Sequence, residues 1–368
     1  MTEWREFKIK DIADVVGGGT PSTAINEYWN GDIPWLTPKD LTGYIRNFIS
    51  HGERFITKKG LENSSARLLP KGTVLLTSRA PIGYVAIAEN EICTNQGFKS
   101  LVPNPDKAHN LFLLYWIKSN VEYLQSIGTG TTFQEISGSV LKDVDIILPP
   151  LPEQKAIAEV LSSLDDKIDL LTRQNKTLED LAQAYFRKWF IEDASDKWEE
   201  IPLGQLFVIS SGKGLKKEKF TEHGQYRVLG ANGEIGKTNE YLFNERLIYT
   251  GRVGTLGNVF IVDREPVWLS DNTLVFRNIK YFFFVYFSLK WANLADYNVG
   301  STQPLIRQSD IKEIRVFMPD KERLDSFENL ANSIFAKINS NQKQIQLLQK
   351  LRDTLLPKLI SGEIRVKM

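Results

Sequence analysis

Cysteine and histidine are scarce in this chain, and their scarcity excludes two common ways of stabilising a fold. Among 368 residues there is a single cysteine, Cys93, and the three histidines, His51, His109 and His223, are scattered. A disulfide framework needs paired cysteines, and a structural zinc site needs closely spaced Cys and His ligands. We therefore expect neither a disulfide nor a bound metal.

Long hydrophobic runs and an excess of either charge are also missing. The richest apolar stretch, Tyr281 to Leu289, falls well short of the roughly 18 residues of a membrane-spanning helix. The opening residues, Met1 to Arg5, fit neither a signal peptide nor a lipidation motif. With 46 basic and 45 acidic residues, charge alone neither demands nor excludes nucleic acid. We expect an ordered, cytoplasmic protein of two or three domains.

An internal repeat is the most informative feature present. Residues 130–181 recur at residues 300–351 with a constant offset of 170, so that Pro149 corresponds to Pro319. The start of the unit recurs at an offset of 194, where Trp4 corresponds to Trp198. The chain is therefore two copies of one unit, whose front parts differ in length by 24 residues (194 − 170).

The front part of each unit has the pattern of a mixed α+β module. Short β-branched runs at 73–77, 83–88 and 144–148 predict strands, because glycine and proline bound them. Residues 111–118 predict a buried helix, with a counterpart at 281–288.

A long heptad seam follows each module. After the prolines at 149–152, apolar residues recur every seven positions along two rows through residue 189, and the same rows recur at the offset of 170. Pro357 and Ser361-Gly362 predict the end of the second helix. Two unrelated amphipathic helices, each packed on its own module, would be the simpler alternative.

A repeat with an internal two-fold axis would bring these helices together antiparallel, so that the residue numbers of facing partners have a constant sum. If the polar seam residues Asn175 and Asn341 face each other, the sum is 516 and nearly every seam residue meets another. Leu164 against Arg352 fits poorly, and register shifts of seven would also join the seams. A helix over 156–189 would be about 51 Å long, which exceeds one turn of B-DNA.

The motifs in this order resemble those of the specificity (S) subunit, HsdS, of Type I restriction-modification systems. The resemblance covers essentially the full length. It rests on the segments around the two seams and on the openings of the first module, namely 148–155, 351–363, 17–21, 32–40 and 79–83.

The resemblance implies a fold of two mixed α/β target-recognition domains separated by two long helices in an antiparallel coiled coil, with internal pseudo-two-fold symmetry. The domains would span 1–150 and 191–320, and the spacer helices 151–190 and 321–368. Each domain would read one half of a bipartite site on double-stranded DNA. The helices would set the gap and dock two methyltransferase (M) subunits, and restriction and translocation (R) subunits would complete the complex. S-adenosylmethionine, ATP and Mg would then be bound by those partners and no cofactor by this chain.

Candidate DNA contacts lie where strands give way to turns and in two repeated loops. Arg79 and Arg252 follow corresponding strands and can reach a phosphate or a guanine, although pairing with a carboxylate is an equal alternative. Glycine and hydroxyl loops suited to phosphate oxygens recur at both copies. Their candidate residues are Thr131, Thr132 and Gln134 in the first loop and Ser301, Thr302 and Gln303 in the second. The alternative is that these loops only connect elements, and a role shared by both copies favours backbone positioning over base reading.

Lysines form the remaining candidates. Lys213, Lys216 and Lys217 make the most basic stretch of the second module, and Lys39 is a weaker candidate in the first. Such a run supports electrostatic contact with DNA, but a solvated face is as common.

No catalytic chemistry is visible in the chain. An amino-methyltransferase signature, a Walker A loop and a nuclease carboxylate-lysine cluster are all missing from the sequence. We therefore expect a non-catalytic, sequence-specific DNA-binding subunit. The alternatives are an enzyme acting alone on DNA and a scaffold that tethers two protein partners through its coiled coil.

Overall fold

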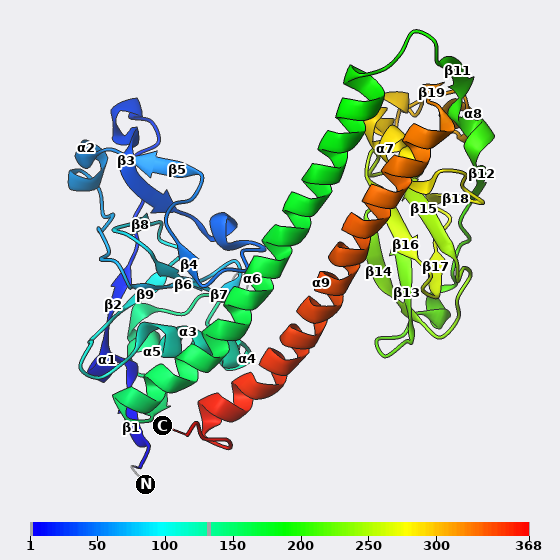
Figure 1. Ribbon diagram of the computed structural model, residues 1–368. Helices are drawn as coiled ribbons and strands as arrows, with labels where there is room; N and C mark the ends of the chain where they lie inside the picture. The colour runs from blue at the N-terminus through cyan, green and yellow to red at the C-terminus, as the bar shows by residue number, and fades with distance from the viewer. Residues whose placement is uncertain (1–2, 131–133, 368) are drawn as a thin grey trace. The chain divides into compact units, whose positions relative to one another are not determined.

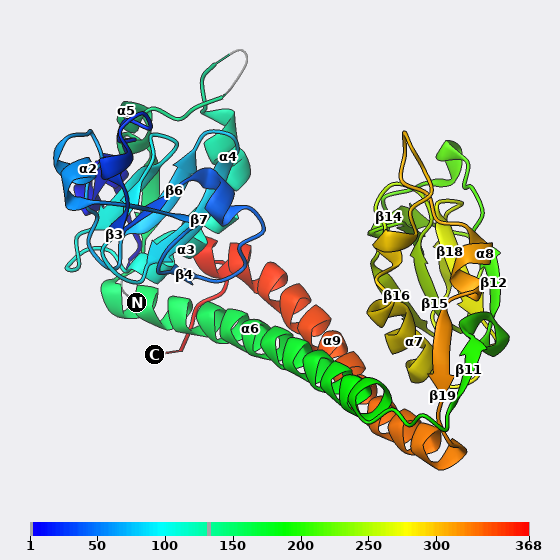
Figure 2. The same ribbon diagram turned by 90° about the horizontal axis from the view of Figure 1, so that it is seen from above.

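The computed structural model describes residues 3–130 and 134–367, and the chain divides into two compact units. Unit 1 comprises residues 1–173 and 341–368, and unit 2 comprises residues 174–340. Each unit holds one mixed α/β module and a segment of each long helix, α6 (Leu151–Arg187) and α9 (Lys321–Ser361) (Figure 1 and Figure 2). The predicted α+β class is confirmed.

The described residues of unit 1 form three sheets. The largest has the strand order β2-β9-β6-β7-β4, the second β5-β3-β8, and the third pairs β1 with β10. Helices α3 (Asn110–Ser119) and α4 (Val121–Ser126) pack on β7, and the short helix α5 (Gly138–Lys142) packs on β2. The strands are β1 (Arg5–Lys8), β2 (Ala13–Gly17), β3 (Trp29–Leu36), β4 (Phe48–Ile49), β5 (Arg54–Ile56), β6 (Val74–Ser78), β7 (Ile82–Ala88), β8 (Cys93–Thr94), β9 (Lys99–Pro103) and β10 (Asp145–Leu148).

Unit 2 repeats this plan with shorter connections. Its sheets have the orders β12-β18-β15-β16, β14-β13-β17 and β11-β19, and its helices α7 (Phe282–Trp291) and α8 (Gln308–Lys312) correspond to α3 and α5. The strands are β11 (Glu199–Pro202), β12 (Val208–Ser211), β13 (Tyr226–Gly230), β14 (Gly233–Thr238), β15 (Arg246–Gly251), β16 (Val259–Asp263), β17 (Val267–Leu269), β18 (Thr273–Arg277) and β19 (Arg315–Met318).

The length difference between the modules is concentrated after β3 and β13. The offset is 193 between the equivalent residues Leu36 and Leu229, but 174 between the equivalent residues Ser78 and Arg252, so unit 1 carries 19 additional residues between them (193 − 174). In unit 1 this segment contains two short helices, η2 (Pro38–Leu41) and α2 (Lys58–Glu62), and the edge strand β4. The predicted drift in length is therefore largely one insertion.

The buried helices α3 and α7 correspond at an offset of 172, not the expected 170. Their apolar side chains fill the cores of the two modules, and polar groups from the long helices serve their N-terminal ends. The Gln154 side chain of α6 accepts a hydrogen bond from the backbone N–H of His109 (2.8 Å). In unit 2 the Glu328 side chain of α9 accepts bonds from the backbone N–H groups of Phe283 (2.8 Å) and Phe284 (2.9 Å).

The long helices pair antiparallel within each unit. In unit 1, Ile168 and Leu171 of α6 pack in one cluster with Ile345 and Leu348 of α9, and these are the layers expected for a constant sum of 516. α9 ends at Ser361, and Gly362 takes a left-handed φ of 78° that closes it, as expected. Helix α6 begins at Leu151, five residues before the 156–189 span used above to estimate its length, because proline is tolerated in a first turn.

In unit 2 the amide Nδ2 of Asn175 donates a hydrogen bond of 3.4 Å to the carbonyl of Ile338, and Leu178 and Ile338 pack against the same core. Asn341 belongs to unit 1, where its side chain is fully buried. The facing of the two asparagines stays a prediction.

Candidate functional site

The strand ends that carry Arg79 and Arg252 are equivalent, but the two arginines are not. The backbone N–H of Ile136 donates to the carbonyl of Ser78, and that of Ile306 donates to the carbonyl of Arg252, each over 3.0 Å. Arg252 therefore corresponds to Ser78, and Arg79 corresponds to Val253, which corrects the expectation by one residue. A strand followed by a glycine-bearing turn does not fix register, and a slip of one residue reverses the face on which a side chain emerges.

In unit 1 three charged side chains meet beside the first glycine loop. Arg79 lies 3.6 Å from the Glu135 carboxylate, and Lys99, the first residue of β9, lies 3.2 Å from the same carboxylate. The stem of Lys99 passes over two glycines, because a Cβ placed on Gly17 or on Gly138 would lie 3.9 Å from its Cδ. Arg79 thus has the carboxylate partner that we weighed as the alternative to a DNA contact.

In unit 2 a different set of side chains occupies the equivalent place. Ser211 and Gln308 stand where unit 1 has Gly17 and Gly138, and the Gln308 amide donates to the Ser211 hydroxyl over 3.1 Å. The guanidinium Nη1 of Arg252 lies 3.4 Å from the same hydroxyl, and its Nε is buried without a hydrogen-bond partner. Sequence reasoning missed Lys99, Glu135, Ser211 and Gln308, although Ser211 and Gln308 were detectable as departures from glycine at the two repeat offsets.

The glycine and hydroxyl loops are only partly described. Thr131 and Thr132 lie outside the described residues, whereas Gln134 is exposed beside Glu135. In unit 2, Ser301, Thr302 and Gln303 are all exposed, and the loop is closed by Asn298, whose side chain accepts bonds from the backbone N–H groups of Gly300 and Leu305. A contact of these residues with DNA stays a prediction.

The lysine candidates are all at the surface. Lys216 and Lys217 open the short helix η5 (Lys217–Lys219), and their side chains are exposed. Lys39 is exposed in η2 and pairs with Glu53 over 3.0 Å. Lys213 is exposed too, but its backbone is held firmly, since its N–H donates to Leu269 and its carbonyl accepts from the Trp268 indole over 2.7 Å.

The backbone carbonyl of Lys213 accepts a tryptophan hydrogen bond that both modules keep although their sequences differ. In unit 1 the equivalent carbonyl of Gly19 accepts a bond of 2.9 Å from the indole of Trp35. Trp35 lies on β3 beside Cys93 of β8, whereas Trp268 lies on β17 beside Val228 of β13, so the large and small residues have exchanged strands. The same donor reaches the same carbonyl from the neighbouring strand.

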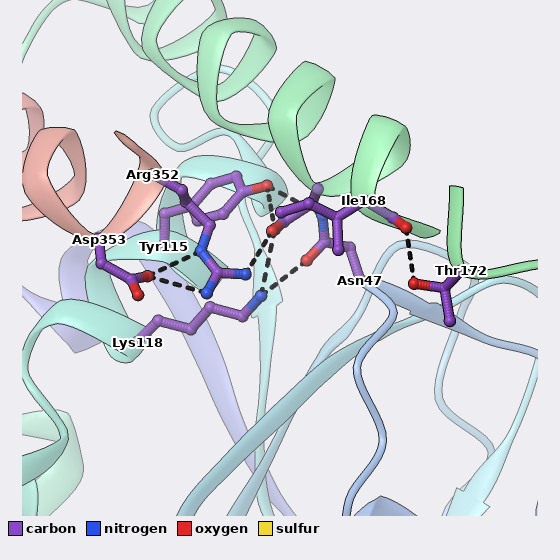
Figure 3. Close-up of polar contacts among 8 residues, drawn as sticks. Asn47, Tyr115, Lys118, Ile168, Thr172, Arg352 and Asp353 are labelled. Atoms are coloured by element: carbon purple, nitrogen blue, oxygen red, sulfur yellow. Dashed lines mark hydrogen bonds and ion pairs between the residues drawn. The ribbon is translucent and has the colours of Figure 1, made fainter. Parts of the chain in front are cut away.

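A buried polar network joins the module of unit 1 to its helix pair (Figure 3). Asp165 of α6, whose side chain is only 6% exposed, accepts hydrogen bonds of 2.8 Å from Arg352 of α9 and from the Tyr115 hydroxyl of α3. The Lys118 ammonium lies 3.5 Å from the same carboxylate and donates to Asn47, which in turn donates to Tyr115. Asn47 comes from the insertion, so the network ties the divergent part of the module to both helices.

The charges of this network tune one another. Burial by itself would raise the pKa of Asp165, but the Lys118 ammonium and the hydrogen bonds from Arg352 and Tyr115 outweigh it and lower that pKa. Burial lowers the pKa of Lys118, and the Asp165 carboxylate opposes that effect only in part. Arg352 also binds Asp353 over 2.8 Å, so it bridges two carboxylates.

Unit 2 has an aromatic cluster at the equivalent positions. By the offsets of 170 and 172, Phe335, Ala182 and Phe287 stand where unit 1 has Asp165, Arg352 and Tyr115. The rings of Phe287 and Phe335 pack 6.1 Å apart, and Ala182 is fully buried in the same core. Lys290, the equivalent of Lys118, pairs instead with Glu179 over 2.6 Å.

The residues that the structure describes offer neither a metal site nor a membrane-spanning helix. Within residues 3–130 and 134–367, no three His, Cys, Asp or Glu side chains are grouped to hold a metal ion. Across the same described ranges, no helix has both the length and the apolar character needed to cross a bilayer.

Comparison with known proteins gave consistent matches. The Type I restriction modification DNA specificity domain matches residues 1–180 and again 195–353. The chain is 38% identical to the Type I restriction enzyme MjaIX specificity subunit of Methanocaldococcus jannaschii, over 99% of this chain and 94% of the relative. It is 24% identical to the MjaVIII specificity subunit of the same organism, over the same shares. A crystal structure of the S subunit from M. genitalium shares the fold, with a TM-score of 0.66 at 22% identity over 100% of this chain and 97% of the other.

Proposed function

Because this chain belongs to the Type I restriction-modification DNA specificity family, we propose that each module reads one half of a bipartite site on double-stranded DNA. The observation that carries the proposal is that the family model matches twice, once over each copy of the repeat. The two copies share a fold but differ in their inserted segment and in the charged and polar side chains beside Lys99 in unit 1 and Arg252 in unit 2. Such differences suit two different half-sites.

The long helices are the part of the repeat that keeps one constant offset, and we propose that they set the gap between the half-sites and bind the partner subunits. Each helix continues directly from the last strand of a module, β10 into α6 and β19 into α9, so the length of a helix bears on the distance between the modules. Their heptads recur at one constant offset, which suits two copies of one methyltransferase subunit. Restriction and translocation subunits would join that complex. S-adenosylmethionine, ATP and Mg would be bound by these partners, and this chain supplies recognition without catalysis.

The test is to express the chain with its methyltransferase subunit in a bacterial host that lacks other DNA methylation, and then to map the methylated bases. We expect a single motif of two short defined parts separated by an unspecified gap. The matched pair of variants exchanges residues 1–150 or residues 191–320 for the aligned segment of the MjaIX specificity subunit. Each exchange should change one defined part of the motif and leave the other intact. Methylation that follows no motif, or a motif that neither exchange alters, would refute the proposal.

A further inference from the structure

Each unit places one cation at the same point of its module, although the two cations come from different strands. The point lies beside the end of the first strand of the main sheet and the first residue of a short helix, at Gly17 and Gly138 in unit 1 and at Ser211 and Gln308 in unit 2. Lys99 reaches it from the start of β9, whereas Arg252 reaches it from just beyond the end of β15.

The electrostatic surroundings of the two cations are opposite. In unit 1 the Glu135 carboxylate pairs with both Lys99 and Arg79. At the repeat offset of 170 its equivalent in unit 2 is Leu305, whose backbone bridges Val253 as Glu135 bridges Arg79. Among the residues that the structure describes, Arg252 has no carboxylate partner within 4.0 Å.

The polar groups around Arg252 are held in place and left with free donor capacity. Its backbone N–H donates to Asn272 over 2.8 Å and its carbonyl accepts from Ile306 over 3.0 Å, so the root of the side chain is fixed. Ser211 is fixed by strand pairing with Leu274. The Nε of Arg252 is buried without a partner, and a buried guanidinium donor without an acceptor is costly.

We propose that Arg252, Ser211 and Gln308 form a phosphodiester-binding site in unit 2, and that Glu135 closes the equivalent site in unit 1. The inference rests on the proposed function, because it identifies which DNA group this part of the module takes. A phosphate oxygen accepts a charge-assisted bond from the guanidinium, and the serine hydroxyl and the glutamine amide add neutral donors. In unit 1 the carboxylate already satisfies both cations, and its own charge repels a phosphate.

The asymmetry has a measurable signature, since each phosphate that a protein neutralises releases condensed counterions. The logarithm of the association constant then falls with the logarithm of salt concentration, with a slope of about −0.9 per phosphate on duplex DNA. Losing one such contact should make the slope about 0.9 less negative. Freeing a cation in unit 1 should make it more negative by a similar amount.

The experiment measures binding of the full-length chain to a random 30-base-pair duplex by fluorescence anisotropy between 50 and 200 mM NaCl. Arg252→Ala should make the slope about 0.9 less negative, whereas Arg252→Lys should keep most of the wild-type slope. Glu135→Gln should steepen the slope by at least about 0.9, because it frees two cations. The matched control is Lys337→Ala, which removes an exposed cation on α9 within unit 2. It should change the slope by less than Arg252→Ala does. Thermal melts by circular dichroism confirm that each variant is folded.

The outcomes separate this inference from the proposed function. A wild-type chain that binds the duplex while Arg252→Ala keeps its slope would overturn the phosphate site and leave DNA recognition standing. A slope unchanged by Glu135→Gln would overturn the claim that the unit 1 site is closed by that carboxylate. A wild-type chain that binds no duplex, alone or with its methyltransferase subunit, would overturn the proposed function and this inference with it.

Discussion

Removing the Arg352 guanidinium should destabilise unit 1 through the charge that it leaves behind. In Arg352→Ala the Asp165 carboxylate, 6% exposed, keeps the Tyr115 hydroxyl at 2.8 Å and the Lys118 ammonium at 3.5 Å but loses its 2.8 Å ion pair. Breaking a buried ion pair from one side commonly costs about 3 to 5 kcal/mol. Because Lys118 remains and Arg352 is itself a quarter exposed, we expect about 2 to 3 kcal/mol.

The aromatic set of unit 2 provides the comparison that tests this reasoning. Gln349 of α9 corresponds to Glu179 of α6 at the offset of 170. The quadruple variant Tyr115→Phe, Asp165→Phe, Gln349→Glu and Arg352→Ala therefore gives unit 1 the residues found at the equivalent positions of unit 2. Replacing both partners of a buried pair by apolar groups is often neutral, so this variant should be more stable than Arg352→Ala alone. The measurement is hydrogen exchange of the amides of α3 and of residues 151–173 of α6 in the full-length chain, which reports the stability of unit 1 without assuming two-state unfolding.

The control and the pH dependence make the prediction refutable. Lys10→Ala removes a solvent-exposed ion pair with Asp143, which water screens, so it should cost less stability than Arg352→Ala. The folded-state pKa of Asp165 is below its ordinary value of 3.8, so its stabilising contribution is complete above about pH 4 and is lost as the pH falls through that lowered pKa. The difference in stability between wild type and Arg352→Ala should therefore become smaller in acid. A gap no larger than that of Lys10→Ala, or a quadruple variant less stable than Arg352→Ala, would refute the argument.

Three further predictions concern the helices. Glu328→Ala should lose about 1 to 2 kcal/mol, because it strips the acceptor from the backbone N–H groups of Phe283 and Phe284, whereas Glu328→Gln should not. Burial raises the pKa of Glu328, so its ionisation costs stability, and the advantage of Glu328→Gln measured by urea unfolding should shrink as the pH falls through that raised pKa. Replacing Asn175 and Asn341 by leucine should raise the melting temperature while relaxing the register of the helix pair. If engineered cysteines in that variant still crosslinked only at pairs whose residue numbers sum to 516, the relaxed register would be contradicted. Inserting one heptad into both α6 and α9 adds about 10 Å and should lengthen the gap of the methylated motif by about three base pairs, so an unchanged gap would contradict the ruler role.

The parts of the fold that repeat with fixed spacing were predictable, because heptad seams and strand runs are local patterns. The seams placed α6 and α9 and the layers around Ile168 and Leu171, since helical periodicity fixes which residues share a face. Residue pattern also placed β6, β7 and β10 to within a residue or two. The poor layer of Leu164 against Arg352 was a real signal, because Arg352 pairs with the next residue, Asp165, and that carboxylate needs a partner.

The candidate site was less predictable, because its members meet through the tertiary fold. Arg79 and Arg252 share a sequence context but differ by one position in the sheet, and only the hydrogen bonds of Ile136 and Ile306 reveal this. Lys99 and Arg252 approach equivalent points from different strands, so no alignment of the two halves pairs them. A repeat offset identifies equivalent backbone positions. The candidate site depends instead on where the ends of side chains from different strands meet.

The divergence between the two halves also makes their helix segments non-interchangeable. Unit 1 combines Asp165 from α6 with Arg352 from α9, and unit 2 combines Phe335 from α9 with Ala182 from α6. A pairing of two copies of the first half would set the buried Asp165 against Ala182, leaving the carboxylate without its guanidinium. A pairing of two copies of the second half would set Arg352 against an aromatic core with no carboxylate. Since breaking a buried ion pair from one side costs more than the intact pair contributes, the network favours the pairing of unlike halves over that of like halves.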